Sequence, residues 1–301
     1  MMRGLHTPVR AIRRRVFKEV AQLGFKADED TLLADMEAIP YAIVNEDSEK
    51  YRESVYRARA IVRERLRLAM GLSLRPENKP VHLTAGVEAS NISEKYYEPP
   101  LMQVIPSACE SCEENKYEVS NICKGCLAHP CQEVCPKDAI SMVNGRSYID
   151  QEKCIKCGKC KSVCPYDAIA KKERPCQKAC GVNAIKSDKM GRAYIDNEKC
   201  VSCGMCMVSC PFGAISDKSQ IFQLARALSE GENVIAEIAP AFVGQFGDNI
   251  TPRNIKAALR ELGFSEVYEV ALGADIGAIA EAHHYGDKVV TGELPFLLTS
   301  C

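Results

Sequence analysis

The chain has 301 residues, 46% of them hydrophobic, and a formal net charge of −1. This length suggests about two domains, and the small net charge favours neither nucleic acid nor an anionic membrane as a partner. The sequence contains no apolar run of about 18 residues, so it predicts no membrane span. Cysteine is the unusual residue: there are 17, and all but one lie between Cys109 and Cys210.

Residues 1–100 carry no metal-ligand pattern, and we expect a helical region that braces the cysteine region. A first helix is predicted by apolar residues at helical spacing, with Gly24 as its C-cap: Val9, Ile12, Val16, Phe17, Val20 and Leu23. A second helix is expected over 48–70, closed by Gly71. Its arginines are expected to form a solvated face, with a docking surface for an acidic partner as the alternative: Arg57, Arg59, Arg63, Arg65 and Arg67. Residues 76–80 are expected to be a linker, and Pro99-Pro100 marks the start of the cysteine region.

The cysteines also bear on the compartment. Arg14-Arg15 resembles a twin-arginine export signal, but charged residues such as Lys18 and Glu19 follow where a signal needs an apolar stretch. An odd number of cysteines without a secretory signal argues against a disulfide scaffold. Reduced thiols are typical of the cytoplasm, so the sequence predicts a cytoplasmic protein.

Two cysteine runs read C-x2-C-x2-C-x3-C-P without a mismatch. They are Cys154, Cys157, Cys160, Cys164-Pro165 and Cys200, Cys203, Cys206, Cys210-Pro211. In this bacterial ferredoxin pattern three close cysteines bind one 4Fe-4S cube and the fourth binds a neighbouring cube. An internal repeat joins the runs, since Gly145–Asp150 matches Gly191–Asp196. Residues 101–216 therefore predict two ferredoxin-like modules, each a cysteine run, a strand, a turn, a strand and a second run, for one-electron transfer.

Cross-ligation assigns twelve of the cysteines to three sites. Site 1 takes Cys123, Cys126, Cys131 and Cys164; site 2 takes Cys154, Cys157, Cys160 and Cys135; site 3 takes Cys200, Cys203, Cys206 and Cys180. The second module lacks its first C-x2-C pair, which leaves Cys176 and Cys210 two partners short. Our hypothesis is that the unassigned pair folds back to complete site 4: Cys109, Cys112, Cys176 and Cys210. Four 4Fe-4S cubes in series would relay electrons.

Two alternatives concern single residues in this region. Cys109 and Cys112 would also suit a zinc clip or a redox pair, because C-x2-C by itself is unspecific. His129 lies inside the first run and could bind iron, as histidine does in Rieske centres. Four cysteines are already available there, so we expect His129 to be a loop residue.

Residues 217–301 change in character and predict an α/β unit. Ser216-Asp217 is expected to cap a helix through Leu228, and Val234–Ala239 to be a buried strand. Further elements are expected in this order: a helix from Thr251-Pro252 to near Gly263, a strand over Val267–Val270, a helix over Ala274–His284, and a short strand at Val289-Val290. Alternating strands and helices imply a parallel sheet. The fold class is therefore α+β, with a helical region over 1–100, ferredoxin-like modules over 101–216 and the beginning of an α/β domain over 217–301.

Five motifs in order resemble the start of the catalytic domain of iron-only (FeFe) hydrogenases. They are Ile238-Ala239-Pro240-Ala241, Lys256–Phe264, Ala274-Asp275, Gly292-Glu293-Leu294-Pro295 and Thr299-Ser300-Cys301. Gly4–Arg10 and Ile105–Cys109 resemble the monomeric branch called group B. The resemblance implies a cytoplasmic enzyme of an anaerobe that interconverts H2 with protons and electrons. It also implies a soluble ferredoxin as electron partner and an H-cluster beside the four 4Fe-4S clusters.

Cys301 matches the first cysteine of that family's Thr-Ser-Cys-Cys-Pro motif, which binds the 4Fe-4S part of the H-cluster. The family's later H-cluster cysteines do not occur in these 301 residues, so we expect no complete catalytic site here and the front part of a longer protein. For Cys301 the alternative is a terminal thiol without a function. For the chain the alternatives are a stand-alone polyferredoxin electron carrier or subunit, and a hydrogenase-like H2 sensor.

Overall fold

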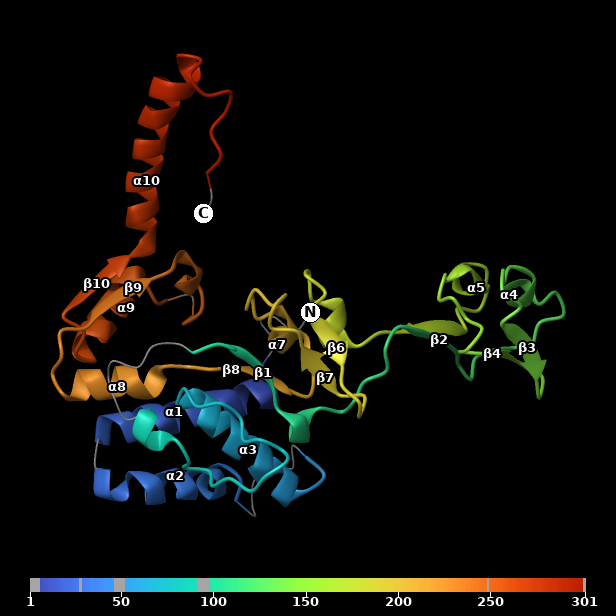
Figure 1. Cartoon of the computed structure of the whole chain (residues 1–301), viewed down its shortest axis with the longest axis horizontal. Helices are drawn as coiled ribbons and strands as arrows, with labels where there is room; N and C mark the ends of the chain where they lie inside the picture. The colour runs from blue at the N-terminus through green and yellow to red at the C-terminus, as the bar shows by residue number, and fades with distance from the viewer. Residues whose placement is uncertain (1–5, 27–28, 46–51, 91–97, 248, 300–301) are drawn as a thin grey trace.

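The structure is a computed structural model that describes residues 6–26, 29–45, 52–90, 98–247 and 249–299. Its N-terminal part is a helical body made of α1 (Pro8–Lys26), α2 (Glu29–Ile43) and α3 (Val55–Ala69), against which the later helix α8 (Ile221–Ser229) packs (Figure 1). One hydrophobic core joins all four helices, with Val20, Met36, Val62 and Phe222 fully buried. Apolar burial is therefore the main force that holds these helices together.

The first two helices differ from the sequence prediction. Gly24 is not a C-cap, because α1 continues to Lys26. A Cβ on Gly24 would lie 2.8 Å from the Cβ of Ala225, so this glycine allows α1 and α8 to approach each other closely. Helix α2 was not predicted, and it contains Pro40, a residue that usually signals a helix end.

Helix α3 begins at Val55 rather than at residue 48, and residues 48–51 lie outside the described part of the chain. It ends as predicted before Gly71, which has a φ of +78°. The expectation of a solvated arginine face was wrong for Arg65 and Arg67, which are 5% and 6% exposed. Arg67 donates to the carbonyls of Ser73, Leu83 and Ala85 at 2.6–2.9 Å. Because the irregular segment after α3 makes few backbone hydrogen bonds of its own, a buried guanidinium supplies the missing donors.

The cysteine region consists of small antiparallel sheets and helices of one turn. The strand pairs are β1 (Met102–Val104) with β8 (Ile215–Asp217), β2 (Lys116–Val119) with β5 (Ile169–Lys172), β3 (Ile140–Val143) with β4 (Arg146–Ile149), and β6 (Ile185–Ser187) with β7 (Ala193–Ile195). The helices are α4 (Pro130–Glu133), α5 (Lys159–Ser162), α6 (Pro175–Lys178) and α7 (Met205–Ser209). Short 3-10 turns, η1 (Val87–Ala89) and η2 (Pro106–Ala108), lie before them. The predicted strand–turn–strand repeat is confirmed by β3–β4 and β6–β7.

The two modules are nested. The β2–β5 pair forms the base of an arm, residues 120–168, which contains the whole first module and stands away from the helical body (Figure 1). The second module is assembled from chain on both sides of this arm, and β1–β8 joins its two ends. Because of this nesting, the segment around Cys109 lies next to residues that come much later in the chain.

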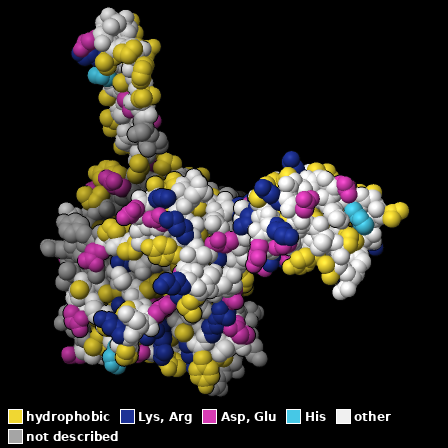
Figure 2. Space-filling model, turned by 45° about the vertical axis from the view of Figure 1, so that its right-hand side comes forward, with side chains coloured by type: hydrophobic (Ala, Val, Ile, Leu, Met, Phe, Trp, Pro, Cys, Tyr) yellow, Lys and Arg dark blue, Asp and Glu magenta, His cyan; other side chains and the backbone are white. Residues whose placement is uncertain are grey.

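The C-terminal part contains the predicted parallel strands, β9 (Ile235–Ile238) and β10 (Glu266–Glu269), with η3 (Pro240–Phe242) and α9 (Pro252–Glu261) between them. Thr251 begins α9 with a capping box to Asn254, as its position before Pro252 predicts. Helix α10 (Val270–Tyr285) comes next and stands apart from the body in Figures 1 and 2, with Leu272, Ile276 and Ile279 exposed.

Three predictions for this part were wrong. Ser216-Asp217 belong to β8, and α8 begins only at Ile221. Strand β9 is largely exposed, with Ala236 its one buried residue. Val289-Val290 lie in a π-helical turn, η4 (Gly286–Val290), rather than in a strand. Among the helices of the described ranges, none is long and apolar enough to cross a bilayer.

Candidate functional site

The first C-x2-C pair of each site has the same local backbone. In each pair the residue before the second cysteine has a positive φ: Ser111 (46°), Gly125 (56°), Lys156 (59°) and Ser202 (54°). The next cysteine of each site is the second residue of a one-turn helix: Cys131 in α4, Cys160 in α5, Cys176 in α6 and Cys206 in α7. The Cys109–Cys112 pair therefore forms the same kind of loop as the three pairs that lie in continuous runs.

The fourth cysteine of each site also repeats one geometry. Its Sγ accepts the backbone N–H of an alanine four residues later, at 3.3, 3.4, 3.2 and 3.4 Å: Ala139 to Cys135, Ala168 to Cys164, Ala184 to Cys180, and Ala214 to Cys210. The residue before each alanine has a positive φ, which turns this N–H towards the sulfur: Asp138, Asp167, Asn183 and Gly213. A hydrogen bond of this kind stabilises negative charge on a ligating sulfur.

Three cavities are each lined by four of the predicted cysteines. The site 1 cavity is lined by Cys123, Cys126, Cys131 and Cys164; the site 2 cavity by Cys135, Cys154, Cys157 and Cys160; the site 4 cavity by Cys109, Cys112, Cys176 and Cys210. The space free of protein atoms is about 330, 340 and 320 Å³ in this order, solvent at the mouth included. Cavities of nearly equal size with the same donor set suit the same bound group.

The cysteines of site 3 also lie together. Cys206 is buried, and Cys180 and Cys200 are half-buried, in one cluster with Ile185 and Ile195 that also includes Cys109 and Cys176 of site 4. Burial, together with the nearby thiolates of Cys200, Cys180 and Cys203, raises the pKa of Cys206 to about 11. At site 4, burial and then Cys210 raise the pKa of Cys176 to about 12. Iron binds cysteine as the thiolate. The positive charge of an iron core would therefore stabilise the thiolates that burial and crowding otherwise disfavour.

The four thiols at each of sites 1, 2 and 4 are the donor set of a 4Fe-4S cube. Among the described residues, no three Cys, His, Asp or Glu side chains converge closely enough for one ion. Thiolates around one zinc ion would be ~3.8 Å apart, whereas a cube holds its thiolates on four separate corners. The zinc clip considered for Cys109 and Cys112 stays an alternative prediction, because four thiolates are also a zinc donor set. His129 lies in the loop before α4 and does not line the site 1 cavity, as expected for a loop residue.

The sites lie in two pairs. Cys131 of site 1 and Cys135 of site 2 stand on and just after α4, and Cys176 of site 4 and Cys180 of site 3 do the same at α6. Four helical residues advance ~6 Å, so the members of a pair are neighbours. Strand β2 connects the pairs, because Cys112 belongs to site 4 while Tyr117, five residues later, lines site 2. Such a segment spans at most ~18 Å.

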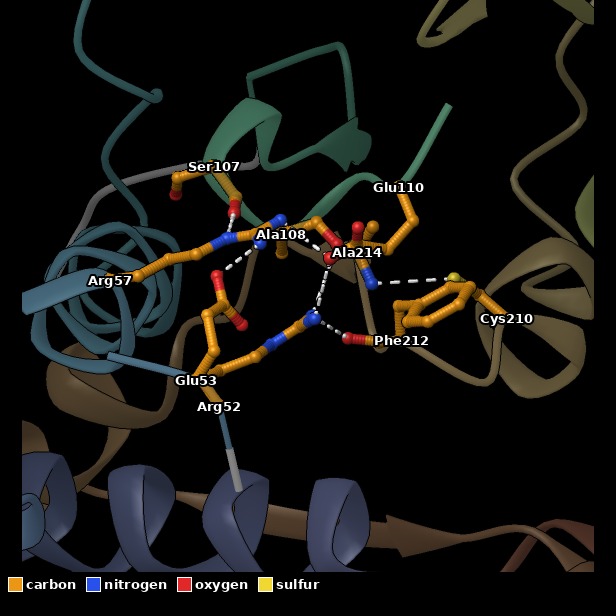
Figure 3. Close-up of polar contacts among 9 residues, drawn as sticks. All are labelled: Arg52, Glu53, Arg57, Ser107, Ala108, Glu110, Cys210, Phe212 and Ala214. Atoms are coloured by element: carbon orange, nitrogen blue, oxygen red, sulfur yellow. Dashed lines mark hydrogen bonds and ion pairs between the residues drawn. The ribbon is translucent and has the colours of Figure 1, made fainter. Parts of the chain in front are cut away.

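The helical body is bonded directly to site 4, as Figure 3 shows. Arg52 forms an ion pair with Glu110 at 2.9 Å and donates to the carbonyls of Ala108 and Phe212 at 3.1 and 2.8 Å. Arg57 pairs with the same Glu110 carboxylate at 2.5 Å and donates to the Ser107 carbonyl at 2.7 Å. These contacts hold both sides of site 4, the segment before Cys109 and the segment after Cys210. The expected brace is therefore a set of arginine contacts to one site.

A larger cavity lies where the helical body, helix α7, the segment after Cys210 and residues 244–247 meet, with about 2340 Å³ free of protein atoms, solvent at the mouth included. Cys210, Pro211 and Phe212 line one side, and Gly244 and Gln245 line another. The rest of the lining comes mainly from the helical body, with Met207 and Val208 of α7. Cys301 lies outside the described residues.

Sequence reasoning missed several residues of these sites. Arg52 and Arg174 were not singled out, and Arg57 was named only as part of an arginine face, because their partners at site 4 lie far away in the sequence. Tyr117 was missed for the same reason, although its hydroxyl would lie 2.5 Å from a Cβ on Gly158 of site 2. The alanines could have been found, since Cys-x3-Ala occurs after the last cysteine of every site.

Three family models match parts of the chain. The iron only hydrogenase large subunit, C-terminal domain matches residues 232–301, the LdpA Fe-S cluster-binding domain matches 123–174, and the 4Fe-4S binding domain matches 193–216. The C-terminal match and the iron–sulfur matches together make this an iron-only hydrogenase-like iron–sulfur protein.

Curated relatives agree with the iron–sulfur part. An uncharacterized ferredoxin of Methanocaldococcus jannaschii is 33% identical over 99 residues, which is 27% of this chain and 63% of that ferredoxin. The electron transport protein HydN of Escherichia coli is 37% identical over 71 residues, 23% of this chain and 41% of HydN. The chain thus spans less than two thirds of both relatives. It covers 68% of the ferredoxin 7Fe of Hydrogenibacillus schlegelii at 43% identity over 53 residues, 18% of this chain. Through its cysteine-rich segment, the chain belongs to the ferredoxin family of iron–sulfur proteins.

Proposed function

We propose that the chain is the electron-input part of an iron-only hydrogenase of an anaerobe, acting in the cytoplasm and holding four 4Fe-4S cubes at sites 1 to 4. One observation carries the proposal: a single cavity is lined by Cys109, Cys112, Cys176 and Cys210, although the arm separates these residues in the sequence. With this set complete, every cysteine of the region has a place in a group of four. Each cube would supply a one-electron centre, and the protein would supply thiolates, N–H donors and exclusion of water.

In this proposal electrons pass between the arm and the C-terminal segment. The arm holds sites 1 and 2, strand β2 leads to site 4, and Cys210 of site 4 shares the lining of one cavity with Gly244 and Gln245 of the hydrogenase-type segment. Cys301 would be the first ligand of the H-cluster in a chain that continues with the remaining motif cysteines. That longer protein would interconvert H2 with protons and electrons.

A soluble ferredoxin is the proposed electron partner, and the site 2 loop is where we expect it to bind. Four exposed lysines surround the cysteines of this loop: Lys153, Lys156, Lys159 and Lys161. Three of the matching positions at site 3 carry Ser202, Met205 and Met207 instead. The basic loop would attract an acidic carrier, and screening by salt would weaken this attraction.

The ligand assignment is tested by counting iron and sulfide in the purified chain after anaerobic reconstitution. We expect about sixteen iron atoms per chain, and about twelve in both Cys109→Ser and Cys176→Ser, with the same EPR signal lost in each. A Cys109→Ser variant that keeps all of its iron would contradict site 4.

The activity is tested with a matured protein that includes the sequence after Cys301. We expect H2 evolution from reduced methyl viologen. A product that takes up and passes on electrons but evolves no H2 would favour the stand-alone polyferredoxin, for which the ferredoxin relatives are the supporting observation.

The binding site of the partner is tested by the rate of electron transfer from a reduced acidic ferredoxin. We expect this rate to fall with ionic strength and to drop at least tenfold in Lys156→Glu/Lys159→Glu. Lys186→Glu is the control, because Lys186 already pairs with Asp196 at 2.7 Å. Equal effects of the two changes would contradict a role for the site 2 loop.

A further inference from the structure

Arg174 stands directly before α6, and its side chain is only 3% exposed. Its Nε and Nη2 both donate to the carbonyl of Cys112, at 3.0 and 2.8 Å. Nη2 also donates to the Gly191 carbonyl at 2.7 Å, and Nη1 to the Lys186 carbonyl at 3.4 Å. One guanidinium therefore joins the C-x2-C loop of site 4, the β6–β7 hairpin and the helix that carries Cys176.

Site 1 needs no such connection. There the C-x2-C pair and the helix cysteine are linked by a short stretch of chain, since only four residues separate Cys126 from Cys131. In site 4 the whole arm separates Cys112 from Cys176, so bringing them together costs much more loop-closure entropy. The position that matches Arg174 in the first module is His129, which lies beside the continuous loop. Arg174 thus replaces a covalent connection with hydrogen bonds.

The charge of Arg174 also matters at this site. Arg174 and Glu110 are the two charged residues that line the site 4 cavity, and Arg52 and Arg57 already neutralise Glu110. Glu114, 3.4 Å from Arg174, is 40% exposed and is therefore better screened by solvent. A cube with four thiolates is anionic and gains a further negative charge on reduction. A buried cation at its edge favours the reduced state.

We propose that Arg174 is the positioning residue of site 4: it fastens the discontinuous Cys109–Cys112 loop onto α6 and raises the reduction potential of the cube bound there. The proposal rests on the function proposed above, since it requires a cube at site 4. Arginine suits both tasks because its planar guanidinium offers several fixed donors and stays charged.

Three substitutions separate the donors from the charge. Arg174→Met removes both, Arg174→Gln keeps an amide donor without charge, and Arg174→Lys keeps the charge with fewer fixed donors. Iron content and an EPR-monitored redox titration are measured for each, with Cys176→Ser as the reference that identifies the EPR signal of site 4. Arg192→Gln is the matched control, because Arg192 lies in the same module and pairs with Glu77 and Asp188 but does not line this cavity.

We expect Arg174→Met to bind about twelve iron atoms instead of about sixteen and to lose the signal that Cys176→Ser loses. Arg174→Lys should restore that signal at nearly the native potential, and Arg174→Gln should show it at a lower potential. Full iron content and an unchanged potential in both Met and Gln variants would overturn the proposal, as would iron loss spread over all four cubes. An unaltered protein with only about twelve iron atoms would instead refute the four-cube function.

Discussion

Single residues with a positive φ shape each cysteine site. Asp138, Asp167, Asn183 and Gly213 all precede the alanine whose N–H bonds to sulfur. Asn and Asp tolerate this conformation, so three sites need no glycine. Only site 4 has a glycine at this position, because the helical body packs closely against Gly213. A Cβ on Gly213 would lie 2.4 Å from Cγ1 of Val9 and 2.7 Å from Nη2 of Arg65.

We predict that Gly213→Ala lowers the thermal unfolding midpoint of the reconstituted protein by more than Gly231→Ala does. Both glycines have a positive φ, +59° and +77°, so both changes carry the left-handed penalty of ~1–2 kcal/mol. Gly231 has no atom within 4 Å of the added Cβ, whereas Gly213 does. The difference between the variants therefore measures the contact between site 4 and the helical body. Equal midpoints would show that this contact contributes nothing.

At the scale of elements, the packing of α1 against α8 depends on Gly24. Gly24 lies inside α1 where α8 crosses it, and Gly273 lies inside α10 with open space around it. Alanine favours a helix over glycine by ~1 kcal/mol. We predict that Gly273→Ala stabilises the protein slightly, while Gly24→Ala destabilises it, because its Cβ would lie 2.8 Å from the Phe222 carbonyl oxygen. Thermal melts followed by circular dichroism would test this, and stabilisation by Gly24→Ala would contradict the packing of α1 on α8.

Arg52, just before α3, and Arg57, within α3, connect the helical body to site 4, and a double substitution tests this connection. We predict that Arg52→Gln/Arg57→Gln loses the cube of site 4 and keeps the other three, because the segments before Cys109 and after Cys210 lose their bonds to the helical body. Iron content and EPR would measure the loss of this one cube. Arg63→Gln is the control, since Arg63 bonds Tyr41 within the helical body. The same iron content in all three proteins would mean that the helical body does not hold site 4.

At the scale of the whole molecule, two kinds of core coexist. The helical body has an apolar core without cysteine, formed by residues such as Val16, Met36, Leu66 and Phe222. The core of the arm and its base is small and consists of Tyr117, Val119, three isoleucines and five of the cysteines of sites 1 and 2. So small an apolar core is not expected to hold a fold without bound metal.

We therefore predict that removal of iron by an anaerobic chelator unfolds the arm and leaves the helical body folded. Hydrogen exchange measured by mass spectrometry should rise steeply over residues 120–168 and change little over α1 and α3. The iron-loaded protein from the same preparation is the reference. Protection of the arm that survives iron removal would show that its fold is independent of the clusters.

The sequence by itself determined the chemistry of the sites, because a ligand run needs only local spacing. The two regular runs and the repeat of Gly145–Asp150 in Gly191–Asp196 predicted the modules, and counting cysteines predicted the four groups. Capping and strand signals also placed α9, β9 and β10, since these signals lie within a few residues of each element.

Only the tertiary structure decided what depends on distant partners. Gly24 is a packing glycine because α8 returns to α1, Arg65 and Arg67 are buried because irregular chain surrounds α3, and α2 forms despite Pro40 within a shared core. The same holds for site 4: spacing could pair its cysteines by elimination, but Arg52, Arg57 and Arg174 could not be found. Their hydrogen bonds to residues 107–112 cross 50 or more positions of sequence, and no local pattern records a contact of that range.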